Sequence, residues 1–146
     1  MRTQKVASGA ETTFVLVFEK GDDPVTELGE FARDEQVGAA QFTGVGAFSD
    51  LVVGYFDRGR KEYRRIPIPE QVEVLSLAGD IALDEDGEPQ VHAHVVVGKA
   101  DGSAHGGHLL EAHVWPTLEV VLVQPPQELR KRIDPETGLA LISLPG

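Results

Sequence analysis

Cysteine is absent from the 146 residues of the chain, and methionine and tryptophan occur once each. Without cysteine the chain can form no disulfide scaffold, no thiolate metal site and no thiol nucleophile. Long apolar runs are missing too. No window approaches the roughly 18 apolar residues of a membrane-spanning helix, and the N-terminal stretch MRTQKVASGAETTF lacks the apolar run of a signal peptide. We therefore expect a cytoplasmic protein with no membrane partner.

Basic residues are also few. The chain has 13 lysines and arginines against 24 aspartates and glutamates, which gives a formal net charge of −11. Proteins that bind nucleic acid through its phosphates need concentrated lysine and arginine, so this charge argues against DNA as a direct partner. The basic cluster DRGRKEYRR, residues 57–65, contains an Arg58-Gly59-Arg60 step that is similar to the core of an AT-hook, but Lys61 stands in the place of the proline. The cluster is more typical of a solvated hairpin turn.

The chain does contain the pattern of one α+β domain. Its length suits a single domain, which we expect to span residues 1–146. Residues 24–37 repeat apolar side chains at helical spacing behind Asp23 and Pro24, which predicts one main helix. The other apolar segments alternate with period two between glycines and prolines, which predicts a mostly antiparallel β-sheet packed with that helix. The expected strands are residues 12–19, 39–57 (one long bent strand or two short ones), 61–70 at an edge, 71–83, 90–98, 105–114, 117–124 and a short last strand after a turn at residues 134–135.

The histidines are concentrated in one segment. All five lie in VHAHVVVGKADGSAHGGHLLEAHV, residues 91–114, as His92, His94, His105, His108 and His113. His92 and His94 are two residues apart on a predicted strand, so their side chains leave the same face of the sheet. The other three follow a predicted turn, so their position depends on the register of a hairpin.

We expect residues 100–102 to form a three-residue hairpin loop, because Gly102 can adopt the left-handed conformation that such a loop needs. Carried inwards, this register sets His94 directly opposite His108 and His92 opposite Leu110. Directly opposed residues share a face and have Cβ atoms about 4.5–5.5 Å apart. The register therefore gathers three of the histidines on one face.

His92, His94 and His108 are the predicted metal ligands. His105 and His113 have the other parity and point away, although a single bulge would exchange His105 for His108. Three imidazoles within a few ångströms of one another suit Zn²⁺, and the lack of an evident fourth ligand leaves a position open for water or a small anion, as in catalytic zinc sites. The alternative is that these are partly buried sheet residues that form hydrogen bonds with their neighbours.

Other residues near the histidines are candidates for supporting roles. A zinc-bound water needs a general base or an orienting carboxylate within hydrogen-bond reach. Glu119, Glu111 and Asp80 are the candidates, although each residue of this kind is more often an outward-facing strand residue than a catalytic acid. Gly106 and Gly107 would leave room for an ion to approach the backbone beside His108. The sequence assigns no catalytic residue beyond these candidates.

Four segments together resemble the PPC domain family: FTGVGAFSDLVVGYFD, VEVLSLAGDIAL, VHAHVVVGKADGSAHGGHL and PTLEVVLV. The resemblance covers about residues 12–125 and leaves a short C-terminal extension. It implies an α+β fold of antiparallel sheet with one main helix, assembled as a homotrimer. It also implies zinc on the histidines that match His92, His94 and His108. The same His-x-His and Gly-Gly-His pattern is similar to that of acetolactate decarboxylase, a zinc enzyme with a related fold.

Two functions follow as hypotheses. The first is a homotrimer with a three-histidine zinc site that acts on or senses a small molecule. The second is a DNA-associated interaction module without enzymatic activity, because prokaryotic members of the resembled family are often described as DNA-binding. The first rests on the predicted convergence of the histidines, and the second on the resemblance and on contact through a partner or through the basic patch around Arg58 to Arg65.

Overall fold

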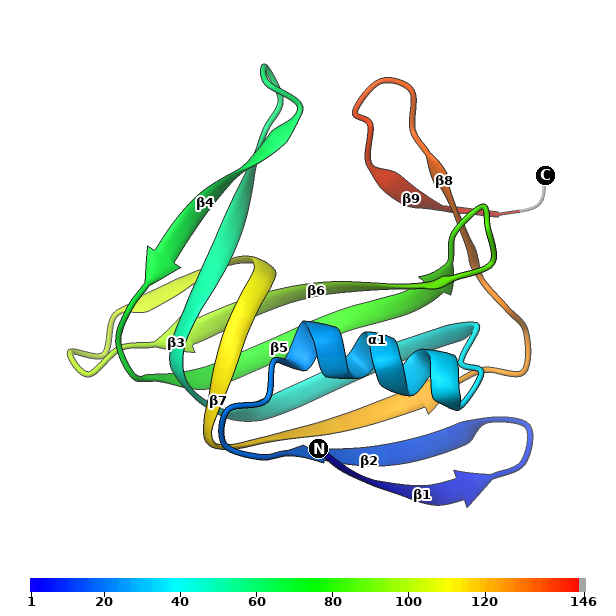
Figure 1. The fold of residues 1–146 in the computed structure, drawn as a ribbon, viewed down its shortest axis with the longest axis horizontal. Helices are drawn as coiled ribbons and strands as arrows, with labels where there is room; N and C mark the ends of the chain where they lie inside the picture. The colour runs from blue at the N-terminus through cyan, green and yellow to red at the C-terminus, as the bar shows by residue number, and fades with distance from the viewer. Residues whose placement is uncertain (145–146) are drawn as a thin grey trace.

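The structure is a computed structural model that describes residues 1–144. Within that range it contains nine strands in one sheet and a single helix (Figure 1). In chain order the elements are β1 (Arg2–Ser8), β2 (Thr12–Phe18), α1 (Pro24–Asp34), β3 (Ala39–Asp57), β4 (Glu62–Ile68), β5 (Val72–Leu83), β6 (Pro89–Gly98), β7 (Ala104–Gln124), β8 (Arg130–Ile133) and β9 (Ala140–Ser143). No helix among the described residues has the length and apolarity needed to cross a membrane.

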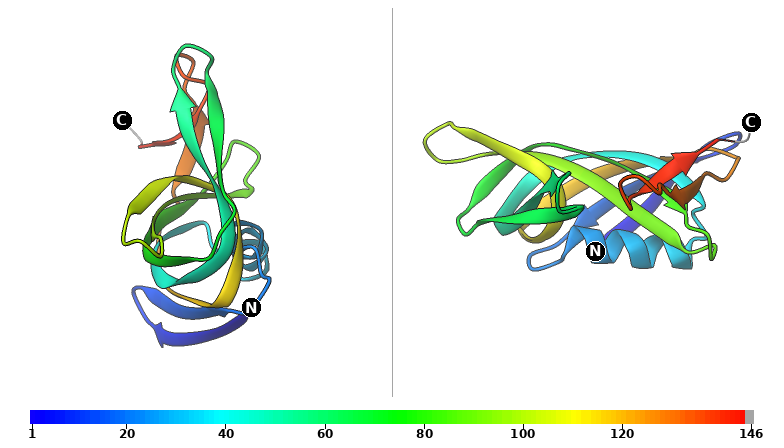
Figure 2. Two further views of the ribbon diagram at one scale, coloured as in Figure 1. Left: turned by 90° about the vertical axis from the view of Figure 1, so that its left-hand side faces the viewer. Right: turned by 90° about the horizontal axis from the view of Figure 1, so that it is seen from above.

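Four of the strands close into a barrel. β3 pairs with β5 and with β7, and β6 pairs with the same two strands, so each of the four has a neighbour on both edges. The end-on view shows this ring (Figure 2, left). β2 extends the sheet from β7, and β1 extends it from β2, both antiparallel. The prediction of a mostly antiparallel sheet with one main helix is confirmed.

The hydrophobic core lies within the barrel and under α1. Alternate residues of each strand face inwards, and on β2 these are Phe14, Leu16 and Phe18, at most 3% exposed. The helix buries Leu28 and Phe31 in the same core. Phe14 and Phe31 meet edge to face with ring centroids 5.1 Å apart, an arrangement that aromatic rings favour. These contacts fix α1 against the sheet.

The helix begins as predicted but ends earlier. Asp23 is its N-cap, with a carboxylate oxygen that accepts a hydrogen bond of 2.9 Å from the Thr26 N–H. The prediction placed the other end at residue 37, whereas α1 ends at Asp34. Gln36 adopts a left-handed conformation with φ of 55°, and the following Val37 N–H donates back to the Ala32 carbonyl at 2.8 Å. This reversal terminates the helix.

Two hairpins project from the barrel on the same side (Figure 1). One consists of β4 and the end of β3, paired from Leu51 with Ile68 to Asp57 with Glu62. The other consists of β8 and β9 near the C-terminus. β6 runs across the barrel between the two hairpins (Figure 1). The edge position of β4 and the last strand are confirmed, whereas β1 and β8 were not predicted.

Gly79 on β5 permits a close contact with β6 below the histidines. A Cβ atom built on Gly79 would overlap the His92 carbonyl oxygen and the ring of Phe42. Gly79 pairs with Ala93, next to the pair of Asp80 with His92. Any side chain at this position therefore displaces β6 or the buried Phe42.

Gly79→Ala is expected to lower the free energy of unfolding by about 1–3 kcal/mol, the usual cost of forcing extra volume into a packed core. Gly9→Ala is the matched control, because a Cβ there meets nothing within 4 Å, and its expected effect is below about 0.5 kcal/mol. Urea denaturation followed by circular dichroism measures both. Equal stabilities of the two variants would contradict this account of the β5–β6 contact.

Candidate metal centre

The hairpin of β6 and β7 has the predicted register. The Lys99 N–H donates to the Ser103 carbonyl at 2.9 Å, which closes the loop at residues 100–102. His94 pairs with His108 directly across the two strands. Because cross-strand partners share a face, their imidazoles project on the same side.

The remaining two histidines lie elsewhere. His105 pairs with Val97, whose side chain is buried in the core, so it does not replace His108. His113 lies further along β7, where its Nδ1 is 2.8 Å from a carboxylate oxygen of Asp50. The hydrogen bond and the charge of Asp50 raise the pKa of His113 above its usual 6.5. The structure therefore gathers His92, His94 and His108 and leaves His105 and His113 outside that group.

His92 has a different cross-strand partner from the one predicted. The β6–β7 pairing runs from His94 to Gly98 and does not reach Leu110, because β7 beyond His108 pairs with β3. On its other edge β6 pairs with β5, which sets His92 opposite Asp80. The face with the histidines therefore spans three strands.

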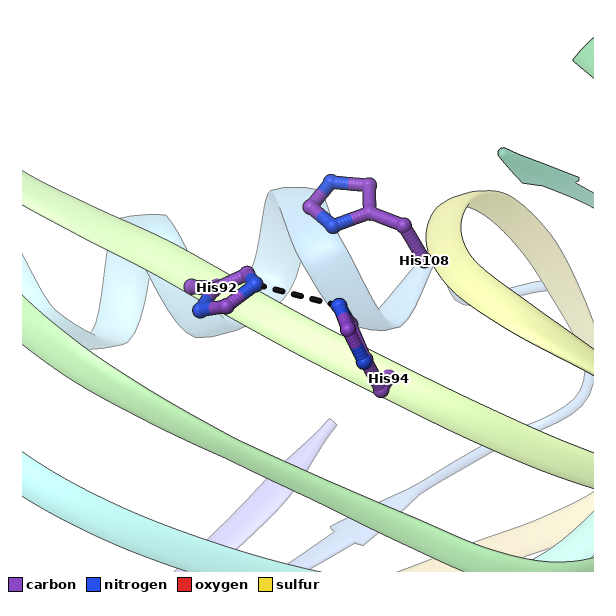
Figure 3. Close-up of side chains that lie close together, drawn as sticks. All are labelled: His92, His94 and His108. Atoms are coloured by element: carbon purple, nitrogen blue, oxygen red, sulfur yellow. Dashed lines mark hydrogen bonds between the residues drawn. The ribbon is translucent and has the colours of Figure 1, made fainter. Parts of the chain in front are cut away.

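The three imidazoles point toward one another (Figure 3). Each of His92, His94 and His108 offers a ring nitrogen, and these nitrogens all lie within 4.8 Å of one another. The Nε2 atoms of His92 and His94 are 3.2 Å apart. The ring centroids of His92 and His108 are 5.3 Å apart, and those of His94 and His108 are 5.5 Å apart. This set of nitrogens could hold one metal ion.

Desolvation lowers the pKa of two of these imidazoles. Desolvation, together with the neighbouring histidines, lowers the pKa of His108 to about 4. Desolvation also lowers the pKa of His94, with a contribution from His92. Neutral imidazole is the form that binds metals, so no proton has to leave these two rings near pH 7.

The Nδ1 atom of His108 supplies a direct test of whether the residues fit a metal. It is buried and has no hydrogen-bond partner among the described residues. A buried polar atom without a partner costs free energy, and native structures rarely leave one unsatisfied. The ring of Tyr63 stacks on His108 at a centroid distance of 4.4 Å and covers the site from β4. The residues present therefore fit a metal bound among the three rings.

Asp80 orients one of the candidate ligands. Its Oδ2 lies 3.1 Å from Nδ1 of His92, which leaves Nε2 of that ring turned toward His94. Its Oδ1 forms an ion pair of 2.7 Å with Nζ of Lys131 on β8, a side chain only 4% exposed. Although desolvation opposes it, the hydrogen bonds from His92 and Lys131 hold the pKa of Asp80 below its usual value. A carboxylate that fixes the far nitrogen of a ligating histidine is common in metal sites.

A cleft of about 570 Å³ opens beside the histidines. Its lining includes the three rings, Asp80, Lys131, Tyr63, Val91 and residues 139–142 of the C-terminal hairpin. Cavities of this size accommodate small molecules. The cleft therefore gives a ligand access to any ion that the histidines hold.

The other candidate carboxylates lie away from the cleft. Glu111 is exposed and pairs with Arg65 at 3.0 Å. Glu119 lines a separate hollow on the outer face of the barrel, next to Val45 and Leu75. Of the three candidates, Asp80 alone lies beside the histidines.

The two glycines before His108 have a different role from the one predicted. A Cβ on Gly106 would come within 2.6 Å of the Val95 carbonyl, and one on Gly107 within 2.8 Å of the Gly54 carbonyl. They admit the backbones of the neighbouring strands rather than an ion.

Two site residues were not predicted. Tyr63 lies on an edge strand, and Lys131 follows the segment that resembles a known family. Gly54 connects Tyr63 with the site. It pairs with His108 across β3 and β7, and on its β4 side a Cβ atom at this position would lie 2.8 Å from the Tyr63 ring. The register of the β3–β4 hairpin could therefore have pointed to Tyr63. Nothing in the sequence pattern indicates Lys131, whose position depends on how the C-terminal hairpin packs.

Several solved structures are similar to this chain. The PPC protein of Pyrococcus horikoshii is 32% identical, with a TM-score of 0.85 and coverage of 92% of both chains. A candidate DNA-binding protein of Ralstonia eutropha JMP134 is 33% identical, with a TM-score of 0.88 and coverage of 98% of this chain and 96% of the other. A metal-containing protein of Archaeoglobus fulgidus is 31% identical, with a TM-score of 0.83 and coverage of 99% of both chains.

More distant likenesses concern the fold alone. Acetolactate decarboxylase of Bacillus subtilis subspecies spizizenii is 11% identical, with a TM-score of 0.54 over 77% of this chain and 52% of that enzyme.

Among curated relatives, the bifunctional protein GlmU of Synechococcus sp. (strain JA-3-3Ab) is 29% identical over 140 residues, which are 94% of this chain. The chain spans about a fifth of the length of the curated relatives that it matches.

The family assignment rests on most of the sequence. Residues 6–125 match the Plants and Prokaryotes Conserved (PCC) domain, and the similar solved structures include a plant- and prokaryote-conserved (PPC) protein. The matched range contains the barrel, α1 and all three clustered histidines. The chain belongs to the Plants and Prokaryotes Conserved domain family.

Proposed function

We propose that this protein binds a divalent transition metal ion, zinc in the first place, through His92, His94 and His108, and receives a small ligand in the adjoining cleft. The observation that carries the proposal is the convergence of one ring nitrogen from each of the three histidines, together with a buried His108 Nδ1 that has no hydrogen-bond partner among the described residues. The metal-containing relative from Archaeoglobus fulgidus supports it. No reaction is part of the proposal.

A bound zinc ion would supply a Lewis-acidic position with room for an oxygen donor. The side chains around it have separate tasks. Asp80 holds the ring of His92 by accepting from Nδ1, and Lys131 neutralises the carboxylate that does so. Tyr63 covers His108 and limits the access of water to that ring. Asp80 is already engaged by two partners, so it serves to position His92 rather than as a free base.

Purified protein is expected to contain about one zinc ion per chain, and His94→Ala is expected to weaken zinc affinity by more than about 100-fold, since loss of an outer-shell partner alone costs 10–100-fold. Plasma mass spectrometry gives the content, and competition with a zinc chelator gives the affinity. His105→Ala is the matched control, because it removes a histidine of the same hairpin with the opposite parity. Sub-stoichiometric zinc in the wild type, or equal affinities in wild type and His94→Ala, would contradict the proposal.

We further propose that three copies of the chain assemble, as the family resemblance implies. An exposed apolar patch on the outer face of the barrel supports self-association. Val45, Leu75 and Val121, from strands β3, β5 and β7, are between 47% and 57% exposed and line one shallow hollow. Exposed apolar patches of this kind commonly mark sites of protein association.

Light scattering coupled to gel filtration is expected to give a mass of about 47 kDa, three times the 15.8 kDa of one chain. Leu75→Glu, which places a charge in the patch, is expected to shift the mass toward that of one chain. Leu144→Glu is the control, because Leu144 is an apolar residue that is 73% exposed and lies after the last strand, outside the patch. A wild-type mass of one chain would overturn the trimer.

The second candidate function is a DNA-associated module, favoured by the likeness to the Ralstonia eutropha protein. Part of the charge of the basic cluster is already paired with acidic side chains. Arg65 pairs with Glu111 at 3.0 Å, and Arg60 lies 3.8 Å from Glu62. Arg64 lies over the ring of Tyr55 at 5.6 Å. With a formal net charge of −11, the chain repels the phosphate backbone as a whole.

A fluorescently labelled DNA duplex is therefore expected to show no binding at about 150 mM salt, where phosphate contacts are already weakened. Fluorescence anisotropy measures this directly. Binding that falls steeply with added salt and disappears in an Arg60→Ala, Arg64→Ala double variant would instead establish the DNA-associated function.

A further inference from the structure

We propose that the C-terminal hairpin of β8 and β9 selects the ligand of the cleft, and that this ligand is a small organic anion with an apolar tail. Its charged end lies among the histidines and Lys131, and its tail lies against residues 139–142. The inference rests on the proposed metal site and goes beyond it by naming the class of ligand and the segment that recognises it.

The hairpin is a separate unit placed over the site. It spans residues 130–143, beyond the segment 6–125 that matches the family domain. Its backbone joins the barrel at one parallel pair, Leu83 with Arg130, next to the Leu83 N–H bond to the Leu129 carbonyl of 2.8 Å. The buried ion pair between Lys131 and Asp80 is its second anchor. The hairpin is therefore fixed by its side chains in a position where it forms one wall of the cleft.

The wall is apolar and faces the histidines. Ile142 pairs with Lys131 across the hairpin, so its side chain shares the face that Lys131 turns toward Asp80. Ile142 is 45% exposed and Leu141 is 48% exposed, and both line the cleft. Val91 adds a further apolar side chain from β6. A ligand tail that covers this surface would gain up to about four-fold in affinity for each methylene group that it buries.

The charges of the lining favour an anion. Asp80 and Lys131 are the charged side chains that line the cleft, and they form an ion pair with each other. The charge of a bound divalent ion is thus not compensated by the lining, and an anionic oxygen donor would compensate it. Without the metal, the charges of Asp80 and Lys131 offset each other, so anion binding should depend on zinc.

The cleft volume sets the size of the ligand. About 570 Å³ lies within the range of small-molecule sites, and it holds a carboxylate of several carbon atoms with room for water. Straight-chain carboxylates are therefore suitable probes, because they differ in tail length alone. Hexylammonium and hexanol match the tail of hexanoate with a positive or no charge.

The experiment is calorimetric titration of the zinc-loaded full chain with acetate, butyrate, hexanoate, hexylammonium and hexanol, after the zinc content has been measured. Affinity is expected to rise at least ten-fold from acetate to hexanoate and to be lost when zinc is removed. Hexylammonium and hexanol are expected to bind at least ten-fold more weakly than hexanoate. Leu141→Ala with Ile142→Ala is expected to remove most of the advantage of hexanoate while acetate affinity and zinc content stay unchanged.

Ile133→Ala is the matched control, because Ile133 is 57% exposed on the same hairpin but does not line the cleft. It is expected to bind all the probes as the wild type does. Full zinc content with affinities that do not depend on tail length would overturn the role of the hairpin and leave the metal site standing. An equal loss in Ile133→Ala would also overturn it. A wild-type protein that binds no zinc would instead remove the proposed function and this inference together.

Discussion

The pairing of β6 with β7 is the constraint on which both the fold and the candidate site depend. These strands are joined by a three-residue loop and paired from His94 with His108 to Gly98 with Ala104. The pairing closes the barrel, because β5 already holds the other edge of β6 and β3 connects β5 with β7. The same pairing brings the ring of His108 to those of His92 and His94. A slip of one residue would open the core and disperse the histidines at once.

The two faces of β6 have different roles, because alternate side chains of a strand point to opposite sides: one face packs in the core and the other carries His92 and His94. Ala93, Val95 and Val97 point inwards and are at most 3% exposed. His92 and His94 point outwards, between the hairpin of β3 and β4 and the hairpin of β8 and β9. The barrel supplies a rigid floor, and the two projecting hairpins supply Tyr63 and the apolar residues 139–142 as walls. Sites on rigid strands hold their ligating atoms more accurately than sites on loops.

The sequence was sufficient for features that depend on neighbours in the chain. Gly102 and the loop around it determine the opposition of His94 and His108, and Asp23 with Pro24 determines the start of α1. Features that depend on distant segments were missed or misassigned. One local feature was missed as well: the loop between β5 and β6 sets Leu83 opposite Pro89, and this register brings Asp80 opposite His92. Glu119 and Glu111 were candidates because they lie near the histidines in sequence, but β7 carries them to other surfaces. Lys131 is placed by tertiary packing, which no local pattern encodes.

The two oxygens of the Asp80 carboxylate serve two different parts of the molecule. One accepts from His92, and the other anchors the C-terminal hairpin through Lys131. The Asp80 carboxylate thus connects the three histidines with the C-terminal hairpin through one rigid group. Two equilibria meet at this carboxylate: the binding of an ion by the histidines and the docking of the hairpin on the barrel. Thermodynamic linkage between them is reciprocal, so if ion binding stabilises the docked hairpin, the docked hairpin stabilises ion binding by the same free energy. A substitution in the C-terminal segment that changes the docking of the hairpin therefore changes the affinity of the histidines for an ion, even where the substituted residue does not contact them.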